Sequence, residues 1–494
     1  MLKQVQHDER NKGTQQMTTE YPQDLQFHVD GEWVEAGDRQ TQDVINPASG
    51  ETLAALPLAN ADDLDRALAA AELGFREWKA KDVNERGAVL RKVADLLRER
   101  VNDIAPLLTL EQGKPVKEAA GEVHGAAGLF DYFAEEAKRA QGRVLVRPAG
   151  QRSIVIKQPV GPVAAFSPWN FPLFLMARKL APALAAGCSI ICKPPEETPA
   201  CCMALMRCVL DAGVPGHVAQ MVFGVPDQVS THLIASPIIR KISFTGSVPV
   251  GKHLMKLAAD GVKRTTMELG GHAPVLIFDD CDLDRTLDII VPQKFRNAGQ
   301  VCVSPTRFYV QNGIYDRFVD EFTKRTEQLT VGNGLEDATE MGPLANERRP
   351  EAVGALIADA AEKGARITTG GDVLGESGFF FRPTVIADVP LDAQIMANEP
   401  FGPVAMMRPF ATLDEAIEQA NRLPYGLAAF AFTENGRQAM LLGDAIESGM
   451  VGINTVGISA VDAPFGGVKE SGFGSEDGPE GLEAYMVTKA VHQA

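Results

Sequence analysis

The sequence predicts an α/β fold built on parallel sheets, and three observations support this prediction. After Pro159, short apolar runs alternate with stretches in which apolar residues recur at three- and four-residue intervals. Repeating strand–helix units of this kind form parallel sheets with helices on both faces. The length of 494 residues allows two large or three smaller domains. A hydrophobic fraction of 45% and a charged fraction of 23% are typical of a globular protein with a sizeable core.

The part of the chain before Pro159 predicts short strands, surface helices and a hairpin. Apolar runs in residues 27–56 are separated by Gly and Asn-Pro turns, which is typical of short strands. Residues 62–78 and 84–100 have the periodicity of amphipathic helices, and a further helix is predicted over 117–140. Residues 143–158 alternate without a helical period, as a β-hairpin does.

After Pro159, two sets of predicted strands follow one another. Apolar runs predict the strands of the first set at 163–166, 189–192, 218–222, 241–244 and 275–278. The second set, after Cys302, has predicted strands at 307–310, 383–386, 404–407 and 427–430, and helices near 314–330, 352–363 and 413–420. The C-terminal residues 484–491 are predicted to form a strand that can pair with another subunit.

Charge and hydropathy exclude several classes of protein. The net charge of −17 disfavours a nucleic-acid or anionic-membrane partner. No apolar run reaches the roughly 18 residues that a membrane span needs. The polar N-terminus lacks the apolar core of a secretory signal, and residues 1–23 are predicted to be a disordered tail.

Cysteine usage points to a reducing compartment and away from a metal. The seven cysteines include no CxxC pair and no Cys/His cluster with zinc spacing, and the eight histidines are scattered. We therefore expect a cytoplasmic protein without a protein-bound catalytic metal.

Cys302 is the first candidate for chemistry. It follows a Gly-containing turn and precedes a Ser-Pro break, so it is expected on an exposed loop where a thiolate can act as nucleophile. The alternative is a small buried hydrophobic residue, which most cysteines are.

Residues 246–252 have the G-x4-G-K spacing of a phosphate-binding loop, but a kinase or ATPase is disfavoured. His253 stands where such a loop needs Ser or Thr for magnesium, and Pro249 removes a backbone N–H. A weaker interpretation remains: Gly246 and Ser247 at a helix N-terminus can hold a phosphate.

Three further segments place polar side chains at strand or helix ends. Lys193 and Glu196 follow an apolar strand at a sheet edge where such folds bind ligands, although a solvated loop is the alternative. Asn170 precedes a helix, as an N-cap or an oxyanion donor, with Arg178 two turns further on. Glu268 precedes two glycines, which suits a mobile base.

Taken together, these segments resemble the aldehyde dehydrogenase superfamily from about Val29 to the C-terminus. The segments that carry the resemblance are 166–172, 193–199, 244–247, 268–271, 299–302, 399–403 and 464–472. The resemblance implies a discontinuous NAD-binding domain of Rossmann type (24–140 and 159–268), an α/β catalytic domain (269–480) and a β oligomerisation arm (141–158 and 481–494). It also implies a homodimer or homotetramer.

The resemblance also implies the roles of the site residues. The Cys302 thiolate attacks the aldehyde, the Asn170 amide and the Cys302 N–H hold the oxyanion, hydride leaves to the nicotinamide, and Glu268 activates water to hydrolyse the thioester. The implied cofactor-binding residues are Ser167, Pro168, Trp169, Lys193, Glu196, Gly246, Ser247, Glu399 and Phe401. A carboxylate at the adenosine ribose would repel a 2′-phosphate, which predicts NAD over NADP.

The residues near Cys302 suggest the substrate. Two buried arginines call for an anionic partner, and Arg178 and Arg296 match positions that bind the far carboxylate in succinate semialdehyde dehydrogenases, with Ser459 assisting. We therefore expect a short ω-oxo-carboxylate, with succinate semialdehyde first and glutarate or 2-oxoglutarate semialdehyde next. In the alternative, one arginine pairs with an internal acid and the pocket accepts neutral aldehydes. Ser304 replaces the second cysteine that forms a disulfide switch in some relatives.

Other classes within the same fold are less consistent with the residues present. A CoA-acylating enzyme often lacks the activating glutamate, whereas Glu268 is present. A structural descendant would be expected to lose Cys302 or Asn170, and both remain.

Overall fold

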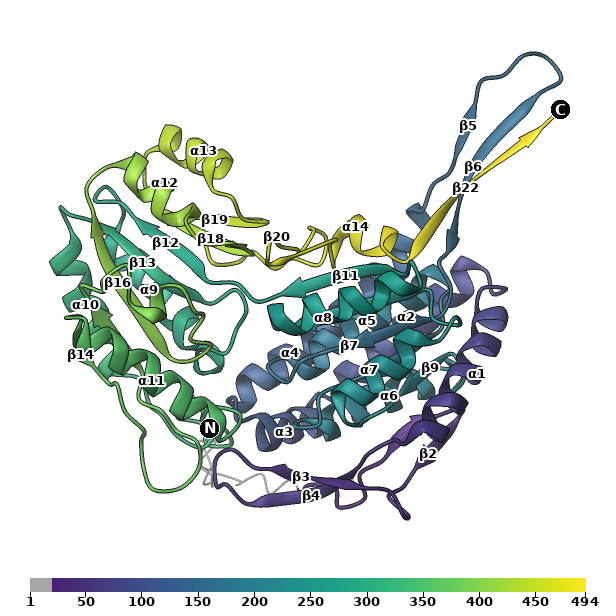
Figure 1. The fold of residues 1–494 in the computed structure, drawn as a ribbon, viewed down its shortest axis with the longest axis horizontal. Coiled ribbons are helices and arrows are strands. Elements are labelled where there is room, and N and C mark those ends of the chain that lie inside the picture. Colours follow the sequence, from purple (N-terminus) through teal and green to yellow (C-terminus); the bar gives the residue numbers. More distant parts are fainter. Residues whose placement is uncertain (1–19) are drawn as a thin grey trace, which may run out of the picture.

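The computed structural model describes residues 20–494, which form two α/β halves and a projecting arm (Figure 1). Most of the predicted tail, residues 1–19, lies outside the described residues. Tyr21 is buried, and its hydroxyl donates a 2.8 Å hydrogen bond to Glu111. Residues 20–23 therefore do not belong to a disordered tail, and the boundary predicted at residue 23 is wrong.

The first half is built on an eight-stranded sheet with the order β2-β1-β9-β8-β7-β10-β11-β21. Its five central strands are parallel, and β1 and β21 pair antiparallel at either side of them. The strands are β1 (Phe27–Val29), β2 (Glu32–Val34), β7 (Val163–Phe166), β8 (Ile190–Lys193), β9 (Ala219–Met221), β10 (Lys241–Gly246), β11 (Arg264–Leu269) and β21 (Gly472–Phe473). Every residue of β7 and β8 is buried, as expected where helices cover both faces of a parallel sheet.

Eight helices accompany this sheet (Figure 1). They are α1 (Ala61–Trp78), α2 (Val83–Glu99), α3 (Val101–Gln112), α4 (Val116–Glu136), α5 (Pro172–Ala186), α6 (Pro199–Asp211), α7 (Pro226–Ala235) and α8 (Val248–Asp260). The sequence pattern missed α3, because Pro106 interrupts a helix with a weak amphipathic period. Helix α5 is buried along almost its whole length, which places its charged side chains inside the protein.

The second half is built on a seven-stranded sheet with the order β14-β15-β16-β13-β12-β18-β19, parallel except for β14. The strands are β12 (Ala273–Ile277), β13 (Pro305–Gln311), β14 (Arg366–Thr369), β15 (Thr384–Ala387), β16 (Val404–Phe410), β18 (Ala428–Phe432) and β19 (Met450–Ile453). The helices are α9 (Leu283–Phe295), α10 (Tyr315–Glu327), α11 (Arg348–Glu362), α12 (Leu413–Asn421) and α13 (Gly436–Ala445), with short 3₁₀ turns η2 (Arg296–Gly299) and η3 (Gln394–Met396).

The run at 275–278 belongs to this second sheet rather than to the first set of strands. Only Gly270, Gly271 and His272 separate β11 from β12. A parallel connection within one sheet needs a long crossover, so the chain instead passes from one sheet to the other at these glycines. Glu268 and Cys302 consequently lie at the junction of the two halves.

The arm is a three-stranded antiparallel sheet that projects away from both halves (Figure 1). It consists of β5 (Arg143–Leu145), β6 (Arg152–Pro159) and β22 (Met486–Gln493), with β22 paired to β6 along its whole length. Val144 and Val146 are 76% and 95% exposed there. The remaining elements are β3 (Thr41–Ile45), β4 (Thr52–Pro57), β17 (Tyr425–Gly426), β20 (Val468–Lys469), η1 (Ala137–Arg139) and α14 (Gly478–Glu483).

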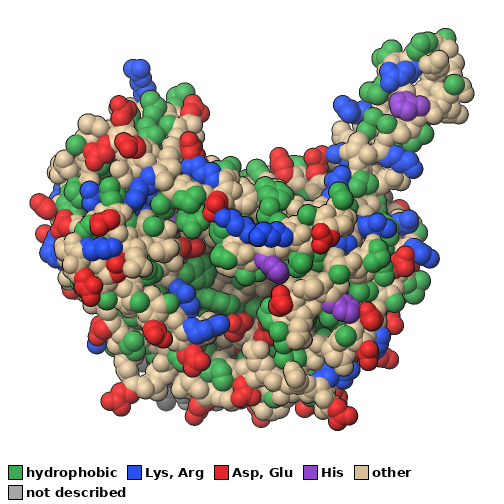
Figure 2. Space-filling model, in the orientation of Figure 1, with side chains coloured by type: hydrophobic (Ala, Val, Ile, Leu, Met, Phe, Trp, Pro, Cys, Tyr) green, Lys and Arg blue, Asp and Glu red, His purple; other side chains and the backbone are tan. Residues whose placement is uncertain are grey.

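Within residues 20–494, no helix is both long and apolar enough to cross a membrane. The same residues contain no group of three or more His, Cys, Asp or Glu side chains placed to hold a metal ion. Between the two halves, the molecule is hollowed on the face shown in Figure 2.

Candidate active site

Cys302 lies on a sharply kinked loop between α9 and β13. Asn297, Ala298 and Gly299 have consecutive positive φ angles of 49°, 52° and 70°. A Cβ on Gly299 would lie 2.1 Å from the carbonyl oxygen of Gly402, so only glycine fits there. Gln112 donates a 2.8 Å hydrogen bond to the Asn297 side chain and holds the kink from the other half. The loop therefore presents Cys302 from a fixed backbone.

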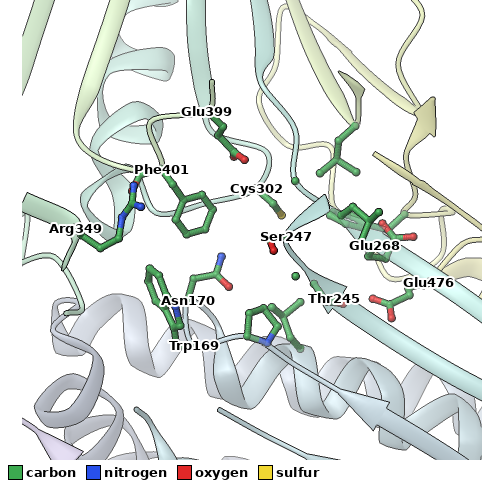
Figure 3. A pocket seen from close by; sticks show the side chains of 17 residues that line it. Trp169, Asn170, Thr245, Ser247, Glu268, Cys302, Arg349, Glu399, Phe401 and Glu476 are labelled. Carbon is green, nitrogen blue, oxygen red and sulfur yellow. The ribbon is translucent and has the colours of Figure 1, made fainter. Parts of the chain in front are cut away.

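Two cavities meet at Cys302. The first, of about 280 Å³, is lined on its polar side by Asn170, Thr245, Ser247, Glu268, Arg349, Glu399 and Glu476. The second, of about 260 Å³, is lined by Phe171, Phe174, Arg178, Arg296, Ser459 and Phe465 among others. Figure 3 shows Cys302, Asn170 and Glu399 pointing into the same space of the first cavity. Each cavity can thus bring a different ligand to the Cys302 sulfur.

The Cys302 thiol is not the exposed, readily ionised group expected from sequence. The residue is only partly exposed, and burial raises the pKa of its thiol to about 12. The Glu399 carboxyl raises this pKa further, whereas the Arg178 guanidinium lowers it. Because a thiolate in apolar surroundings loses solvation, the free enzyme holds Cys302 as a neutral thiol near pH 7.

Asn170 lies beside Cys302 but is not an N-cap. Its Nδ2 donates a 3.0 Å hydrogen bond to the Gln300 carbonyl, and its Oδ1 has no partner among the described residues. Glu122 caps α5 instead, since its Oε1 accepts from the N–H groups of Leu173 and Phe174 at 3.0 and 3.1 Å. The default N-cap interpretation is therefore wrong, and one amide hydrogen of Asn170 stays available to a ligand.

A buried lysine fixes the backbone of Asn170. The Lys114 ammonium donates to the Asn170 carbonyl at 2.7 Å and to Glu122 Oε2 at 2.6 Å. Asn297 donates to the same carbonyl at 2.9 Å. The lysine and Glu122 are both buried, so the ion pair is shielded from solvent and holds the amide and the Cys302 loop together.

Glu268 is a buried carboxyl without a hydrogen-bond partner among the described residues. It lies at the end of β11, and neither carboxyl oxygen is paired. Burial raises the pKa of Glu268 well above its ordinary value, and the nearby Glu476 raises it further, against the opposing effect of Lys179 and Arg178. A carboxyl with a raised pKa near a thiol is suited to proton transfer.

Glu476 lies on the same side of the cavity as Glu268 and pairs with a buried lysine. The Lys179 ammonium donates to Glu476 Oε1 at 2.5 Å and to the Thr245 hydroxyl at 2.7 Å, while Glu476 Oε2 has no partner in the described part of the chain. Figure 3 shows Glu268 and Glu476 on the same side of the cavity. Glu268 and Glu476 thus form one polar wall of the cavity, and Lys179 pairs with Glu476 outside the lining.

The opposite wall is formed by Glu399, Phe401 and Arg349. Burial raises the pKa of Glu399 to about 8, while Arg349 and Lys294 lower it. The rings of Trp169 and Phe401 meet edge to face at 5.5 Å, and the Arg349 guanidinium donates to the backbone carbonyls of Pro400 and Phe401. The wall thus combines aromatic faces with a carboxyl and an arginine.

A further cavity of about 390 Å³ lies beyond Ser247, lined by Ser167, Lys193, Asp227 and His253 among others. Gly246 and Ser247 precede α8, whose N-terminus has no side-chain cap, and they line the first cavity. Two cavities on either side of an uncapped helix N-terminus fit a dinucleotide, with its phosphates at the free N–H groups.

Glu196 does not line this cavity. Its Oε2 accepts from Lys193 at 2.6 Å, and its Oε1 accepts from the Gly224 N–H at 3.1 Å. Both side chains are almost fully buried. The carboxylate that lines the cavity is Asp227, which the sequence reasoning did not consider.

The structure brings Arg178, Arg296 and Ser459 together around the second cavity, but Arg178 already has an anionic partner. Arg178 forms a 2.7 Å ion pair with Asp477 and donates to Ser459 at 3.0 Å. Its guanidinium also lies 4.5 and 4.2 Å from the ring centres of Phe174 and Phe465. The structure thus shows one arginine paired with an internal acid, which was the alternative considered from sequence.

Arg296 differs from Arg178 in its surroundings. It is exposed at the edge of the cavity and lies 5.0 Å from the ring centre of Phe171. Within residues 20–494 it forms no ion pair. Desolvation raises the pKa of the half-buried Glu118 carboxyl, and the charges of Lys114 and Arg296 oppose that rise.

The sequence reasoning missed the residues that surround these groups: Lys114, Glu122, Lys179, Asp227, Arg349, Glu476 and Asp477. No motif marks them. The available signal was a charge inside an apolar helix, as Lys179 is in α5.

The molecule has two α/β halves, with Cys302 at their junction. An uncapped helix N-terminus lies beside the cavities. This arrangement is that of a dinucleotide-dependent oxidoreductase. The model of the aldehyde dehydrogenase family matches residues 33–491, and the chain belongs to this family. It is therefore an NAD(P)-dependent aldehyde dehydrogenase, and the Rossmann-type and catalytic α/β architecture expected from sequence is confirmed.

Its relatives differ in the substrates that their names state. The chain is 51% identical to the 4-(hydroxymethyl)benzenesulfonate dehydrogenase of Comamonas testosteroni, over 94% of this chain and 97% of the relative. It is 43% identical to the NADP⁺ succinate-semialdehyde dehydrogenase of Escherichia coli K12, over 93% and 96%. The crystal structure of succinate-semialdehyde dehydrogenase from Burkholderia pseudomallei superposes with a TM-score of 0.94 at 42% identity, covering 98% of this chain and all of that one (100%).

Proposed function

We propose that the enzyme oxidises an aldehyde that carries an anionic group at its far end, with succinate semialdehyde as the first candidate. The observation that carries this proposal is the second cavity. It leads to Cys302 and is lined by Arg178, Arg296 and Ser459. An aldehyde carbon at the sulfur and an anion at the guanidinium groups would occupy the two ends of one cavity.

Cys302 is proposed as the nucleophile. Because its thiol is neutral in the free enzyme, attack on the aldehyde carbon requires loss of the thiol proton. The ionised form of Glu268, whose oxygens have no partner among the described residues, is proposed to accept that proton. The free hydrogen of Asn170 Nδ2 and the Cys302 N–H are proposed to hold the oxyanion that forms. Removal of one such donor typically costs about 10² to 10³ in rate.

The nicotinamide of the bound cofactor supplies the hydride acceptor for this oxidation. Glu399 is proposed to hold the nicotinamide ribose, with Trp169 and Phe401 packing beside it. Glu268 is proposed as the general base that activates water for hydrolysis of the Cys302 thioester. The proton that Glu268 releases is proposed to pass to Glu476, whose Oε2 has no partner among the described residues and whose Oε1 accepts from Lys179.

NAD is proposed as the preferred cofactor. One carboxylate supports this preference: Asp227 on the cavity wall, which would repel the 2′-phosphate of NADP. Glu196 is already paired with Lys193 and does not line this cavity. Asp227→Ser should raise the kcat/KM ratio of NADP over NAD. An unchanged ratio would remove Asp227 as the reason for a preference.

A second candidate substrate is an aromatic aldehyde with a sulfonate, and a specific observation favours it. Phe171, Phe174 and Phe465 line the second cavity, which suits a flat ring. The relative that acts on 4-(hydroxymethyl)benzenesulfonate is 51% identical to this chain.

The experiment that tests the proposal compares kcat/KM for four aldehydes with NAD and NADP: succinate semialdehyde, butanal, 4-formylbenzenesulfonate and benzaldehyde. Each anionic aldehyde should exceed its neutral counterpart. Equal values within each pair would show that the far anion is not recognised. Absence of reduced cofactor with all four would refute the proposed function itself.

We further propose that the arm joins subunits into a homodimer or homotetramer. Its exposed valines lie on a sheet that has no packing partner within residues 20–494 over most of its length (Figure 1). Light scattering should give a mass of two or four chains, and deletion of residues 486–494 should reduce it.

A further inference from the structure

Within residues 20–494, Asp477 is the one acid that forms an ion pair with an arginine of the second cavity. It follows Glu476 and precedes α14, and its carboxyl lies 2.7 Å from the Arg178 guanidinium. The exposed fractions of the two side chains are 2% and 1%. Its backbone has φ 58° and ψ 174°, a conformation that glycine tolerates and that is strained for other residues. An aspartate at such a position costs conformational energy, so its side chain needs a reason to be there.

The ion pair changes what Arg178 can offer to a substrate. One Arg178 nitrogen contacts both Asp477 and Ser459, and its Nε has no partner within the described residues. A donor therefore remains, but the positive charge is balanced by a carboxylate a few ångströms away. A substrate carboxylate brought to Arg178 would also meet the negative charge of Asp477.

Burial raises the pKa of the Asp477 carboxyl to about 6, and the adjacent Arg178 guanidinium, 2.7 Å away, opposes that effect and favours the ionised form. Arg296, at the exposed edge of the same cavity, has no such partner in residues 20–494. Arg296 is thus the arginine of the cavity that no ion pair within residues 20–494 holds, although the Glu118 carboxyl interacts with it electrostatically.

We propose that Asp477 determines substrate specificity by forming an ion pair with Arg178 inside the protein. The cavity then recognises the anionic group of a substrate mainly through Arg296, and it accepts aldehydes with a neutral or aromatic body. This inference rests on the proposed function and deepens it. A short ω-oxo-acid, which needs Arg178 as well as Arg296 to hold its carboxylate, is recognised less strongly than two free arginines would allow. An aromatic aldehyde, whose acidic group extends to Arg296, does not meet Asp477.

The test replaces the carboxylate without removing the arginine. Asp477→Asn keeps the shape of the side chain, and Asp477→Gly also relieves the backbone strain, so at least one variant should fold. For each enzyme, kcat/KM is measured for succinate semialdehyde, butanal and 4-carboxybenzaldehyde. Ratios between substrates within one enzyme preparation do not depend on the fraction of folded protein. Asp477→Glu retains the charge, and Glu480→Gln, at an exposed acid three residues further on, serves as the matched control.

The ratio of kcat/KM for succinate semialdehyde to kcat/KM for butanal should rise about 10- to 100-fold in Asp477→Asn and Asp477→Gly, since a hydrogen bond to a charged group contributes on that scale. The corresponding ratio of kcat/KM for 4-carboxybenzaldehyde to that for butanal should change less than about threefold. Asp477→Glu and Glu480→Gln should keep the wild-type ratios. If kcat/KM fell by the same factor for all three substrates, Asp477 would have a structural role and the inference would be overturned. If the wild-type enzyme oxidised none of the aldehydes, the proposed function would fail first, and the two failures are therefore distinguishable.

Discussion

Replacing Arg296 with glutamine tests the anion site most directly. A hydrogen bond to a charged group contributes about 1.5–3 kcal/mol, which corresponds to roughly 10- to 100-fold in kcat/KM. Arg296 is exposed at the cavity edge, so solvent and salt screen its charge and the lower end of this range applies. We expect about a tenfold loss for succinate semialdehyde at low ionic strength and a smaller loss at high salt. Butanal should be unaffected.

The assay follows the absorbance of the reduced cofactor under initial-rate conditions with both aldehydes. Arg296→Lys should retain part of the effect because it keeps the charge but not the planar fork. Arg285→Gln, at an exposed position on α9, should match the wild type. If Arg296→Gln lowered kcat/KM for both aldehydes by the same factor, Arg296 would be shaping the loop rather than binding the anion, and the reasoning would be refuted.

Three further predictions follow from the buried groups of the site. Because burial raises the pKa of Cys302 to about 12, its alkylation by iodoacetamide in the free enzyme should accelerate about tenfold per pH unit between pH 7 and 10; a plateau below pH 9 would contradict this. Glu268→Gln should slow both the first turnover and the steady state in stopped-flow measurements, because the thiol proton of Cys302 and the attacking water lose the same acceptor. Its rate should also lose the pH-dependent increase that ionisation of Glu268, whose pKa is raised, produces in the wild type; an unchanged steady state would exclude Glu268 as the base. Arg178→Leu should destabilise the protein by about 3–5 kcal/mol because it leaves Asp477 buried and unpaired, and Arg178→Leu combined with Asp477→Leu should recover most of the apparent melting temperature; no recovery would show that the pair is not the cause.

The predicted secondary structure agrees with the observed elements where local pattern is strong. The hairpin predicted at 143–158 is β5 and β6, and the helix predicted over 117–140 is α4 followed by η1. The assignment of the run at 275–278 to the first set of strands was wrong, because strand pairing depends on the connection and not on the run. Helix α3 was missed, since a proline and a weak apolar period conceal it.

In the candidate site, too, the residues were predictable from local sequence motifs, whereas their surroundings were not. Motif segments spread over the chain were sufficient to nominate Cys302, Asn170, Glu268 and Glu399, and all four line one cavity. Their protonation was not predictable, because the pKa of Cys302 and that of Glu268 depend on burial by residues distant in the chain. The expectation of an exposed thiolate failed for this reason.

Apolar periodicity and short motifs are local properties, so the order of residues alone was enough to predict the α/β class and the family and to nominate Cys302. Partner choice is not local. Whether Arg178 faces a substrate or an internal acid depends on how α5 packs against the segment that carries Asp477, far along the chain, and no spacing rule connects them. Buried charges take whichever partner the packing brings within reach, because an unpaired charge is costly in a low-dielectric interior. The charge available to the substrate was therefore decided by folding.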